Sequence, residues 1–424
     1  MKVCLMNNKT VLKNGVKIIT ESLDYAKSVS LGIWINTGSR FEQKTENGIS
    51  HFIEHMIFKG TPNRDCLQIA REFDNIGGLA NAFTGKEYTC FYSRVLDKHF
   101  ESLGNILSDI FLNSIFDQSD INRESKVILQ EINMVEDSPD EYVHDLFNNV
   151  FWGNNSLGMP VLGTGDTVSG LNREIILNYK NEFYTPERII IAAAGNIDHE
   201  KVVAFFRPLL EPLEAVENNV FTENPCPNYD VLCRNKELEQ VHLCLGARAP
   251  DLLSEKRFAS IVFNTILGGN MSSRLFQEIR EKHGLAYSIY SFISSFIDTA
   301  FLGVSVATDA EDINNVLRLI NAEIKKIQNG ELSEIDLNAV KEHLIGNILL
   351  GSESIDSRMM RMAKYEYLFD RYVEYDEIVN RIELVTLDEV IDSANEIFNT
   401  GRISLATVGP VEKKDLDTGN LIFD

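Results

Sequence analysis

The sequence predicts an α+β protein made of two homologous domains, each with helices packed on a largely antiparallel sheet. The chain has 424 residues, more than one domain of ordinary size holds. A segment near its middle recurs near its end. Each half also opens with short strand patterns and continues with long helical patterns, which is typical of α+β domains.

The repeat lies at residues 181–197 and 395–411. The two copies are 395 − 181 = 214 residues apart, about half of the chain. Each copy has the pattern of a helix end, a turn and a buried strand closed by glycine. One repeat at this distance indicates a duplicated domain and not a solenoid. The shared residues are Asn181, Glu182, Arg188, Ile189, Ala192 and Gly195, which recur as Asn395, Glu396, Arg402, Ile403, Ala406 and Gly409.

Strand and helix patterns follow in the same order in both halves. Strands are expected at residues 16–20 and 28–35 in the first half and at 240–246 in the second. Long helices are expected at 120–137 and 331–350. A stretch rich in Pro, Glu and Asn separates the halves and has the composition of a linker. We therefore predict domains at 1–214 and 236–424, joined by a linker at 215–235.

The charge balance excludes some classes of function. The formal net charge is −23, from 40 basic and 63 acidic residues, so binding to nucleic acid is not expected. An acidic surface keeps a protein soluble and can attract a basic peptide. No apolar stretch is long enough to cross a membrane, and the first residues lack a secretory pattern. The six scattered cysteines suit reduced thiols, so we expect a cytoplasmic protein.

The chemistry lies in the motif His51-Phe52-Ile53-Glu54-His55. On a helix, residues four apart share a face, so His51 and His55 can bind one metal ion. Glu54 can reach a water on that metal without being a ligand itself. The surrounding residues are apolar almost all round, which predicts a buried helix where such polar groups are costly unless they bind something. The alternative is a pair of hydrogen-bonded core histidines.

A catalytic zinc ion needs a third protein ligand. Glu131 lies in the middle of the apolar face made by Val127, Ile128 and Val135, and Glu124 lies two turns earlier on the same face. We predict Glu131 as the third ligand of one Zn²⁺ per chain, with Glu124 supporting the site. The alternative is an exposed amphipathic helix with a different register.

The inverted order of the motif resembles the pitrilysin/insulysin family of zinc metallopeptidases. The chain is most similar to the catalytic subunit of the bacterial and mitochondrial processing peptidases. The distance from His55 to Glu131, 131 − 55 = 76, matches this family, as does Glu124, and the resemblance extends from Leu12 to Gly409. It implies two halves that form a clam-shaped chamber, with a catalytic N-terminal domain. The C-terminal domain would be a degenerate copy that contributes substrate contacts.

The resemblance also implies substrate-binding residues. Asn81, Ala82 and Phe83 match the edge strand on which an extended peptide pairs. Arg280 and Tyr287 match a pair in which Arg holds substrate carbonyls and Tyr donates to the developing oxyanion. Read without the family, these are an ordinary strand after a Gly-Gly turn, a surface arginine and a strand tyrosine.

These observations predict a zinc endopeptidase in which Glu54 is the general base. Its substrates would be extended peptides or N-terminal presequences, with a preference for basic ones, and we expect a homodimer or a heterodimer with a related subunit. One alternative is a non-catalytic or partner-dependent subunit of a processing peptidase complex. Another is a non-haem iron enzyme, which also uses two histidines and a carboxylate.

Overall fold

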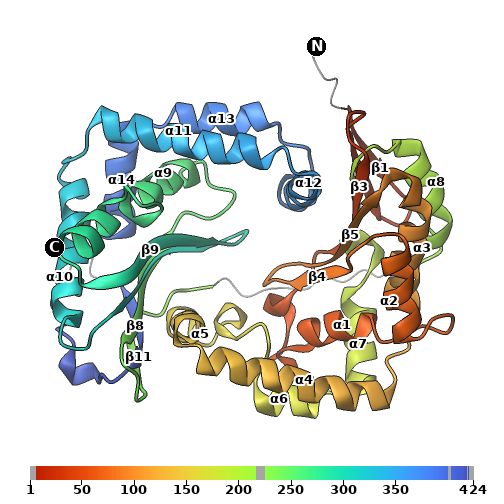
Figure 1. The fold of residues 1–424 in the computed structure, drawn as a ribbon, viewed down its shortest axis with the longest axis horizontal. Helices are drawn as coiled ribbons and strands as arrows, with labels where there is room; N and C mark the ends of the chain where they lie inside the picture. Colours follow the sequence, from red (N-terminus) through yellow and green to blue (C-terminus); the bar gives the residue numbers. More distant parts are fainter. Residues whose placement is uncertain (1–5, 216–224, 400–402, 418, 420–424) are drawn as a thin grey trace. The chain divides into compact units, whose positions relative to one another are not determined.

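The chain folds into two compact units, each built from one sheet and several helices (Figure 1). The computed structural model describes residues 6–215, 225–399, 403–417 and 419. Unit 1 consists of Met1–Asn133, Met159–Thr222 and Leu350–Val373. Unit 2 consists of Met134–Gly158, Glu223–Leu349 and Glu374–Asp424. The predicted α+β class with two helix-covered sheets is confirmed.

The sheet of unit 1 is largely antiparallel, as predicted. Its strands are β1 (Met6–Val11), β2 (Lys17–Ser22), β3 (Ser28–Ile35), β4 (Asn81–Thr84), β5 (Thr89–Leu96) and β6 (Ile189–Gly195). They follow the order β1-β2-β6-β3-β5-β4, in which β2 and β6 are the one parallel pair. β4 is therefore an edge strand of this sheet, paired with β5.

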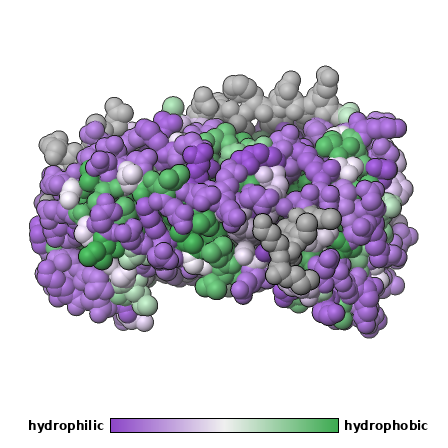
Figure 2. All heavy atoms as spheres, turned by 90° about the horizontal axis from the view of Figure 1, so that it is seen from above, coloured by the Kyte–Doolittle hydropathy of each residue, from purple (hydrophilic) through white to green (hydrophobic). Residues whose placement is uncertain are grey.

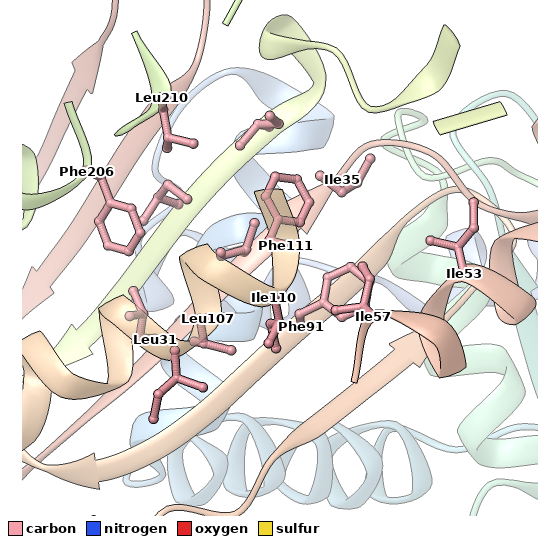
Figure 3. Packing of buried hydrophobic residues seen from close by; sticks show 14 of the residues in the cluster. Leu31, Ile35, Ile53, Ile57, Phe91, Leu107, Ile110, Phe111, Phe206 and Leu210 are labelled. Carbon is pink, nitrogen blue, oxygen red and sulfur yellow. The ribbon is translucent and has the colours of Figure 1, made fainter. Parts of the chain in front are cut away.

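Helices cover both faces of this sheet. They are α1 (Ile49–Ile57), α2 (Cys66–Asn75), α3 (Phe100–Asn113), α4 (Gln118–Asp137, in unit 1 up to Asn133), α6 (Gly165–Gly170), α7 (Arg173–Phe183), α8 (His199–Leu210) and α12 (Ile355–Phe369). Alternate strand residues point to opposite faces. Ile18 and Ile33 belong to the core shared with α1, α3 and α8, whereas Ile19 and Trp34 pack with Met359 of α12. Figure 3 shows the first of these cores, where Ile57 of α1 lies near Phe91 of β5.

The sheet of unit 2 repeats this plan. Its strands are β7 (Val231–Asn235), β8 (Val241–Ala249), β9 (Ala286–Ser295), β10 (Ala300–Thr308) and β11 (Ser404–Gly409). The order is β7-β11-β8-β10-β9, with β7 and β11 parallel. The helical segments are α5 (Pro139–Trp152), α9 (Arg257–Gly268), a π-helical turn (Phe276–Lys282), α10 (Ile313–Gln328), α11 (Glu334–Gly351, in unit 2 up to Leu349), α13 (Tyr375–Glu383) and α14 (Leu387–Ile397).

The two sheets have equivalent topologies, which agrees with the duplication predicted from the repeat. Adding 214 to the bounds of β2, β3 and β6 leads to β7, β8 and β11 within about two residues, the boundary error of such assignments. In both sheets the equivalent strands pair in the same order and direction. β6 and β11 contain the two copies of the repeated segment. Residues 400–402 of the second copy lie outside the described residues.

The compact units differ from the predicted domains because two equivalent helices are exchanged. α5 comes from the first half of the chain and packs on β8 and β11 of unit 2. α12 comes from the second half and packs on β2, β3 and β6 of unit 1. In such an exchange, each sheet is still covered by one helix of the pair, but that helix comes from the other half of the chain. The predicted boundaries 1–214 and 236–424 therefore do not coincide with the compact units.

The predicted linker at 215–235 is shorter than expected. Residues 216–224 lie outside the described residues. Its last five residues, Val231–Asn235, form β7 and pair in parallel with β11. The half-buried residues of β7 are Val231, Leu232 and Cys233, and exposed Arg234 and Asn235 follow, so the apolar run is too short to distinguish this strand from a linker in the sequence.

The surface visible in Figure 2 consists mainly of hydrophilic residues, with hydrophobic residues in smaller groups. This distribution agrees with the net charge of −23 and is typical of a protein kept in solution by charge. Within the described part of the chain, no helix combines the length and the apolar character needed to span a bilayer.

Candidate metal centre

The helix that carries the motif is anchored by its apolar face. Phe52, Ile53 and Met56 of α1 are buried in the core of unit 1, as Ile57 is. His51, Glu54 and His55 occupy the remaining face and are half-buried. The helical periodicity of α1 thus places the buried apolar residues on one face and the three polar residues of the motif on the other, as the sequence pattern predicted.

The structure brings the three predicted ligands together. The Oε2 atom of Glu131 on α4 lies 3.5 Å from Nε2 of His55 and 3.8 Å from Nε2 of His51. One ligand atom from each residue lies within 4.8 Å of the others. A tetrahedral zinc ion with bonds of about 2.1 Å would hold its ligands about 3.4 Å apart. The donor set and its spacing fit one zinc ion. Among the described residues, no second group of His, Cys, Asp or Glu side chains converges in this way.

The electrostatic environment of His51 favours metal binding. Burial lowers the pKa of His51 to about 4, and the nearby His55 ring acts in the same direction. The ring centroids of the two histidines are 4.6 Å apart. A His51 imidazole with this pKa is neutral near pH 7, so its nitrogen lone pair is available to a metal ion.

Glu124 contacts the Nδ1 side of the His55 ring. Its Oε2 atom lies 3.2 Å from Nδ1 of His55, and its Oε1 atom lies 2.7 Å from the ammonium of Lys59. A ring nitrogen that bonds to a carboxylate leaves the other nitrogen to face the metal. This geometry is the one expected of a residue that supports a ligand, as predicted for Glu124. The ammonium of Lys59 offsets the negative charge of the Glu124 carboxylate in its partly buried position.

Glu54 does not belong to the group of three predicted ligands, and it contacts the edge strand β4. Thr84, the last residue of β4, donates a hydrogen bond of 2.5 Å to Oε2 of Glu54. Burial raises the pKa of Glu54 and the charge of Glu131 raises it further, whereas the Thr84 bond and His55 lower it. Asn81, Ala82 and Phe83 precede Thr84 on β4, so the structure places them at the sheet edge next to the motif helix.

Arg280 and Tyr287 lie together in unit 2. The guanidinium of Arg280, in the π-helical turn, lies 4.8 Å from the centre of the Tyr287 ring on β9. The Tyr287 side chain is 79% exposed. Their contacts with substrate stay a prediction, because both belong to the unit that does not carry the metal ligands.

Comparisons with known proteins identify the family of this chain. A family model described as insulinase (peptidase family M16) matches residues 17–165, and one described as the peptidase M16 inactive domain matches 170–344. The uncharacterized zinc protease YmxG of Bacillus subtilis is 40% identical over 405 residues, covering 96% of this chain and 98% of that protein. An uncharacterized zinc protease of Streptomyces coelicolor is 38% identical over 416 residues, covering 96% and 90%. The chain belongs to peptidase family M16.

Members of this family are zinc metallopeptidases, which confirms the predicted family, enzyme class and metal. Solved structures share the fold of the M16 chain. A protease from Helicobacter pylori has a TM-score of 0.89 at 19% identity, covering 96% of this chain and 100% of that one. A Pseudomonas fluorescens structure described as a peptidase M16 inactive domain has a TM-score of 0.89 at 17% identity, covering 96% and 99%.

The sequence does not predict two of the contacts at the candidate site. Lys59 follows His55 by four residues and lies in the turn after α1, which ends at Ile57. Its partner Glu124 lies 65 positions further on (124 − 59). Thr84 ends the strand that begins at Asn81, on the same side as Ala82. Its hydroxyl has no distinctive sequence pattern, and its contact with Glu54 arises only from the packing of β4 beside α1.

Proposed function

We propose that this M16 peptidase is an endopeptidase that cleaves extended peptides with Glu54 as its general base. The observation that carries the proposal is the convergence of His51, His55 and Glu131 next to a carboxylate that is not one of the ligands. A bound zinc ion would supply Lewis acidity toward the scissile carbonyl and toward the attacking water. His51, His55 and Glu131 would hold it.

Glu54 would move the proton. Its carboxylate accepts a proton from the attacking water and delivers it to the nitrogen of the leaving amine. The raised pKa that burial gives Glu54 brings the group closer to the working pH, which favours both transfers. The hydrogen bond from Thr84 occupies one carboxylate oxygen, so it orients the group and keeps it ionised.

The peptide would bind as an additional strand on the edge of the unit 1 sheet. β4 has its partner β5 on one side, and an edge strand offers its other side to an extended chain. Asn81, Ala82 and Phe83 would pair with the substrate backbone. From unit 2, Arg280 would hold substrate carbonyls and Tyr287 would donate to the developing oxyanion.

The net charge of −23 supports a preference for basic peptides, including N-terminal presequences. Screening by salt weakens attraction between exposed charges, so kcat/KM for a basic peptide is expected to fall as ionic strength rises. An acidic peptide of equal length is the control. Equal salt dependence for both peptides would refute the preference without affecting the proposed chemistry.

Removing the metal tests the proposed activity directly. Cleavage of a fluorogenic basic peptide is expected to disappear after EDTA treatment and dialysis, and to return with stoichiometric Zn²⁺. Addition of Mg²⁺ is the control, because a site of two imidazoles and one carboxylate binds this ion poorly. Full activity in the metal-free protein would contradict the proposal. Recovery with Fe²⁺ but not Zn²⁺ would favour the iron-dependent alternative.

The contact between Thr84 and Glu54 predicts a pH effect. Because a donor to a carboxylate stabilises its charged form, Thr84→Val should raise the pKa of Glu54. The base must be deprotonated, so the acid limb of kcat/KM is expected to move to higher pH. Thr84→Ser keeps the hydroxyl and should retain the wild-type profile. An acid limb that does not move in Thr84→Val would mean that another group controls it.

A further inference from the structure

We propose that residues 38–42 form a positioning segment that orients the two parts of the active site separately, through two buried charges. Glu42 holds the N-terminal end of α1, the helix that carries His51, Glu54 and His55. Arg40 holds the turn that follows β4, the strand on which the peptide would pair. The inference rests on the proposed function, and it concerns residues that neither bind the metal nor touch the reacting atoms.

Glu42 caps α1 from outside the helix. The residue at the N-cap position, Gly48, has no side chain to accept the first amide groups of the helix. Glu42 takes this place: its Oε2 atom accepts hydrogen bonds from the Gly48 amide (2.7 Å) and from Nδ2 of Asn47 (2.9 Å). Its Oε1 atom accepts from the Ser50 amide at 2.9 Å. A carboxylate at this end also complements the helix dipole.

The Glu42 contacts have a direct consequence for the metal ligands. Ser50 precedes His51, so the capped amide lies one residue from the first ligand. Glu42 is only 5% exposed, and it accepts bonds with both oxygens. A buried carboxylate whose two oxygens are bonded in this way allows one orientation of the helix start. It therefore sets the direction in which the first turn of α1 presents His51.

Arg40 joins the same segment to the substrate strand. Its guanidinium lies 2.6 Å from Oε1 of Glu87, and both side chains are buried. Glu87 belongs to the turn that leads from β4 to β5. Two backbone bonds extend the attachment, because the amides of Ser39 and Arg40 donate to the carbonyls of residues 85 and 86.

Residues 38–40 and 85–86 approach each other closely, which explains the glycine at position 38 of the segment Gly38-Ser39-Arg40-Phe41-Glu42. A side chain at Gly38 would come within 2.3 Å of the carbonyl oxygen of Gly85. Only a residue without a side chain allows the backbone bonds between residues 39–40 and 85–86. The turn held in this way begins one residue after Thr84, which bonds to Glu54.

Loss of the Glu42 contacts and loss of the Arg40–Glu87 pair are expected to have different effects. Loss of the Glu42 cap should weaken metal binding, because the ligands on the first turn of α1 lose their fixed orientation. Loss of the Arg40–Glu87 pair should weaken peptide binding, because the end of β4 becomes less ordered. A segment that only stabilises the fold would lower thermal stability and change neither quantity selectively.

Unit 1 offers a matched control for both changes. Glu21 on β2 is equally buried and pairs with Arg358 of α12. β6, β3 and β5 separate β2 from β4 within the sheet, so this pair lies away from the proposed site. Glu21→Gln therefore removes a buried carboxylate of the same kind at comparable structural cost.

The first experiment measures zinc affinity by chelator competition, which does not depend on activity. Glu42→Gln replaces one acceptor oxygen with a donor that faces an amide, and its Kd for Zn²⁺ should be weaker by about tenfold. Glu21→Gln should bind Zn²⁺ like the wild type. If Glu42→Gln does not fold, Asn47→Ala is measured instead, since it removes one of the donors to Glu42 and should weaken Zn²⁺ binding to a smaller extent.

The second experiment measures steady-state cleavage of an extended basic peptide at saturating Zn²⁺. Glu87→Gln should raise KM by about fivefold with its Kd for Zn²⁺ unchanged, whereas Glu42→Gln should lower kcat and leave KM close to the wild-type value. Circular dichroism and thermal unfolding establish that each variant is folded.

The outcomes separate the two proposals. Equal Zn²⁺ affinity in folded Glu42→Gln and Glu21→Gln would overturn the inference, as would unchanged Zn²⁺ affinity in Asn47→Ala. Unchanged KM in Glu87→Gln would overturn its second part. A wild-type protein that binds no Zn²⁺ would instead refute the proposed function.

Discussion

Replacing Glu54 with Gln is expected to lower kcat for peptide cleavage by about 10²–10⁴-fold while zinc stays bound, because an amide cannot accept the proton of the attacking water. Glu54 is not among the three convergent ligands, and the hydrogen bond that it accepts from Thr84 can be kept by the amide oxygen of Gln. The variant should therefore retain the fold and the metal. Peptide binding should also remain, so KM is expected to change little.

The control for this variant is its zinc content, measured on the same preparation as the rate. Wild-type activity that vanishes in Glu54→Gln at equal zinc content would establish the base. Equal activity in both proteins would point to a contaminating peptidase and contradict the mechanism. Absence of activity in both, with zinc bound, would favour the alternative in which the chain needs a partner subunit.

The convergence of the two histidines could be predicted because their geometry is local. His51, Glu54 and His55 lie within one helical turn, and α1 has the buried face that the apolar residues between them predicted. Glu131 required a longer step, from a carboxylate on an apolar stripe to a ligand of a distant helix. The structure places Glu131 beside both histidines, as expected for a half-buried carboxylate that needs a partner, and its role as a ligand stays a prediction.

The contacts that support the site could not be predicted in the same way. Lys59, Thr84 and Glu42 act on Glu124, Glu54 and the start of α1 through packing between separate elements. Charged and hydroxyl side chains of these kinds are common, and nothing in their spacing distinguishes a partner of the site from a solvated residue. The positions of these contacts depend on the sheet register between β4 and β5 and on the packing of α1, which arise only in the folded unit.

The exchange of α5 and α12 was missed for a related reason. An amphipathic pattern indicates which residues of a helix are buried, but not which of two equivalent sheets buries them. Phe147 and Phe151 of α5 pack with Phe301 of β10, although α5 follows the ligand-bearing α4 after one residue. Sequence proximity therefore assigned α5 to the first domain, whereas its apolar side chains belong to the core of unit 2.

Replacing Glu131 with Gln is expected to weaken zinc binding by at least about 100-fold, because supporting groups alone cost 10–100-fold and Glu131 is a ligand. Its carboxylate is the one negative charge among the three convergent groups. The matched control is Glu136→Gln, which removes the same charge from an exposed position five residues further along α4. That variant should bind Zn²⁺ like the wild type.

Thermal unfolding provides an independent measurement of the same loss. A ligand that binds only the folded state raises stability in proportion to ln(1 + [L]/Kd), so Zn²⁺ should raise the Tm of the wild type and of Glu136→Gln. The rise should be much smaller for Glu131→Gln at the same Zn²⁺ concentration. Without metal, the Tm of Glu131→Gln should be close to that of the wild type, because the Glu131 side chain is 36% exposed and fills no part of the core. A lower Tm already in the metal-free variant would mean that Glu131 stabilises the fold itself, and an undiminished rise with Zn²⁺ would remove it from the ligand set.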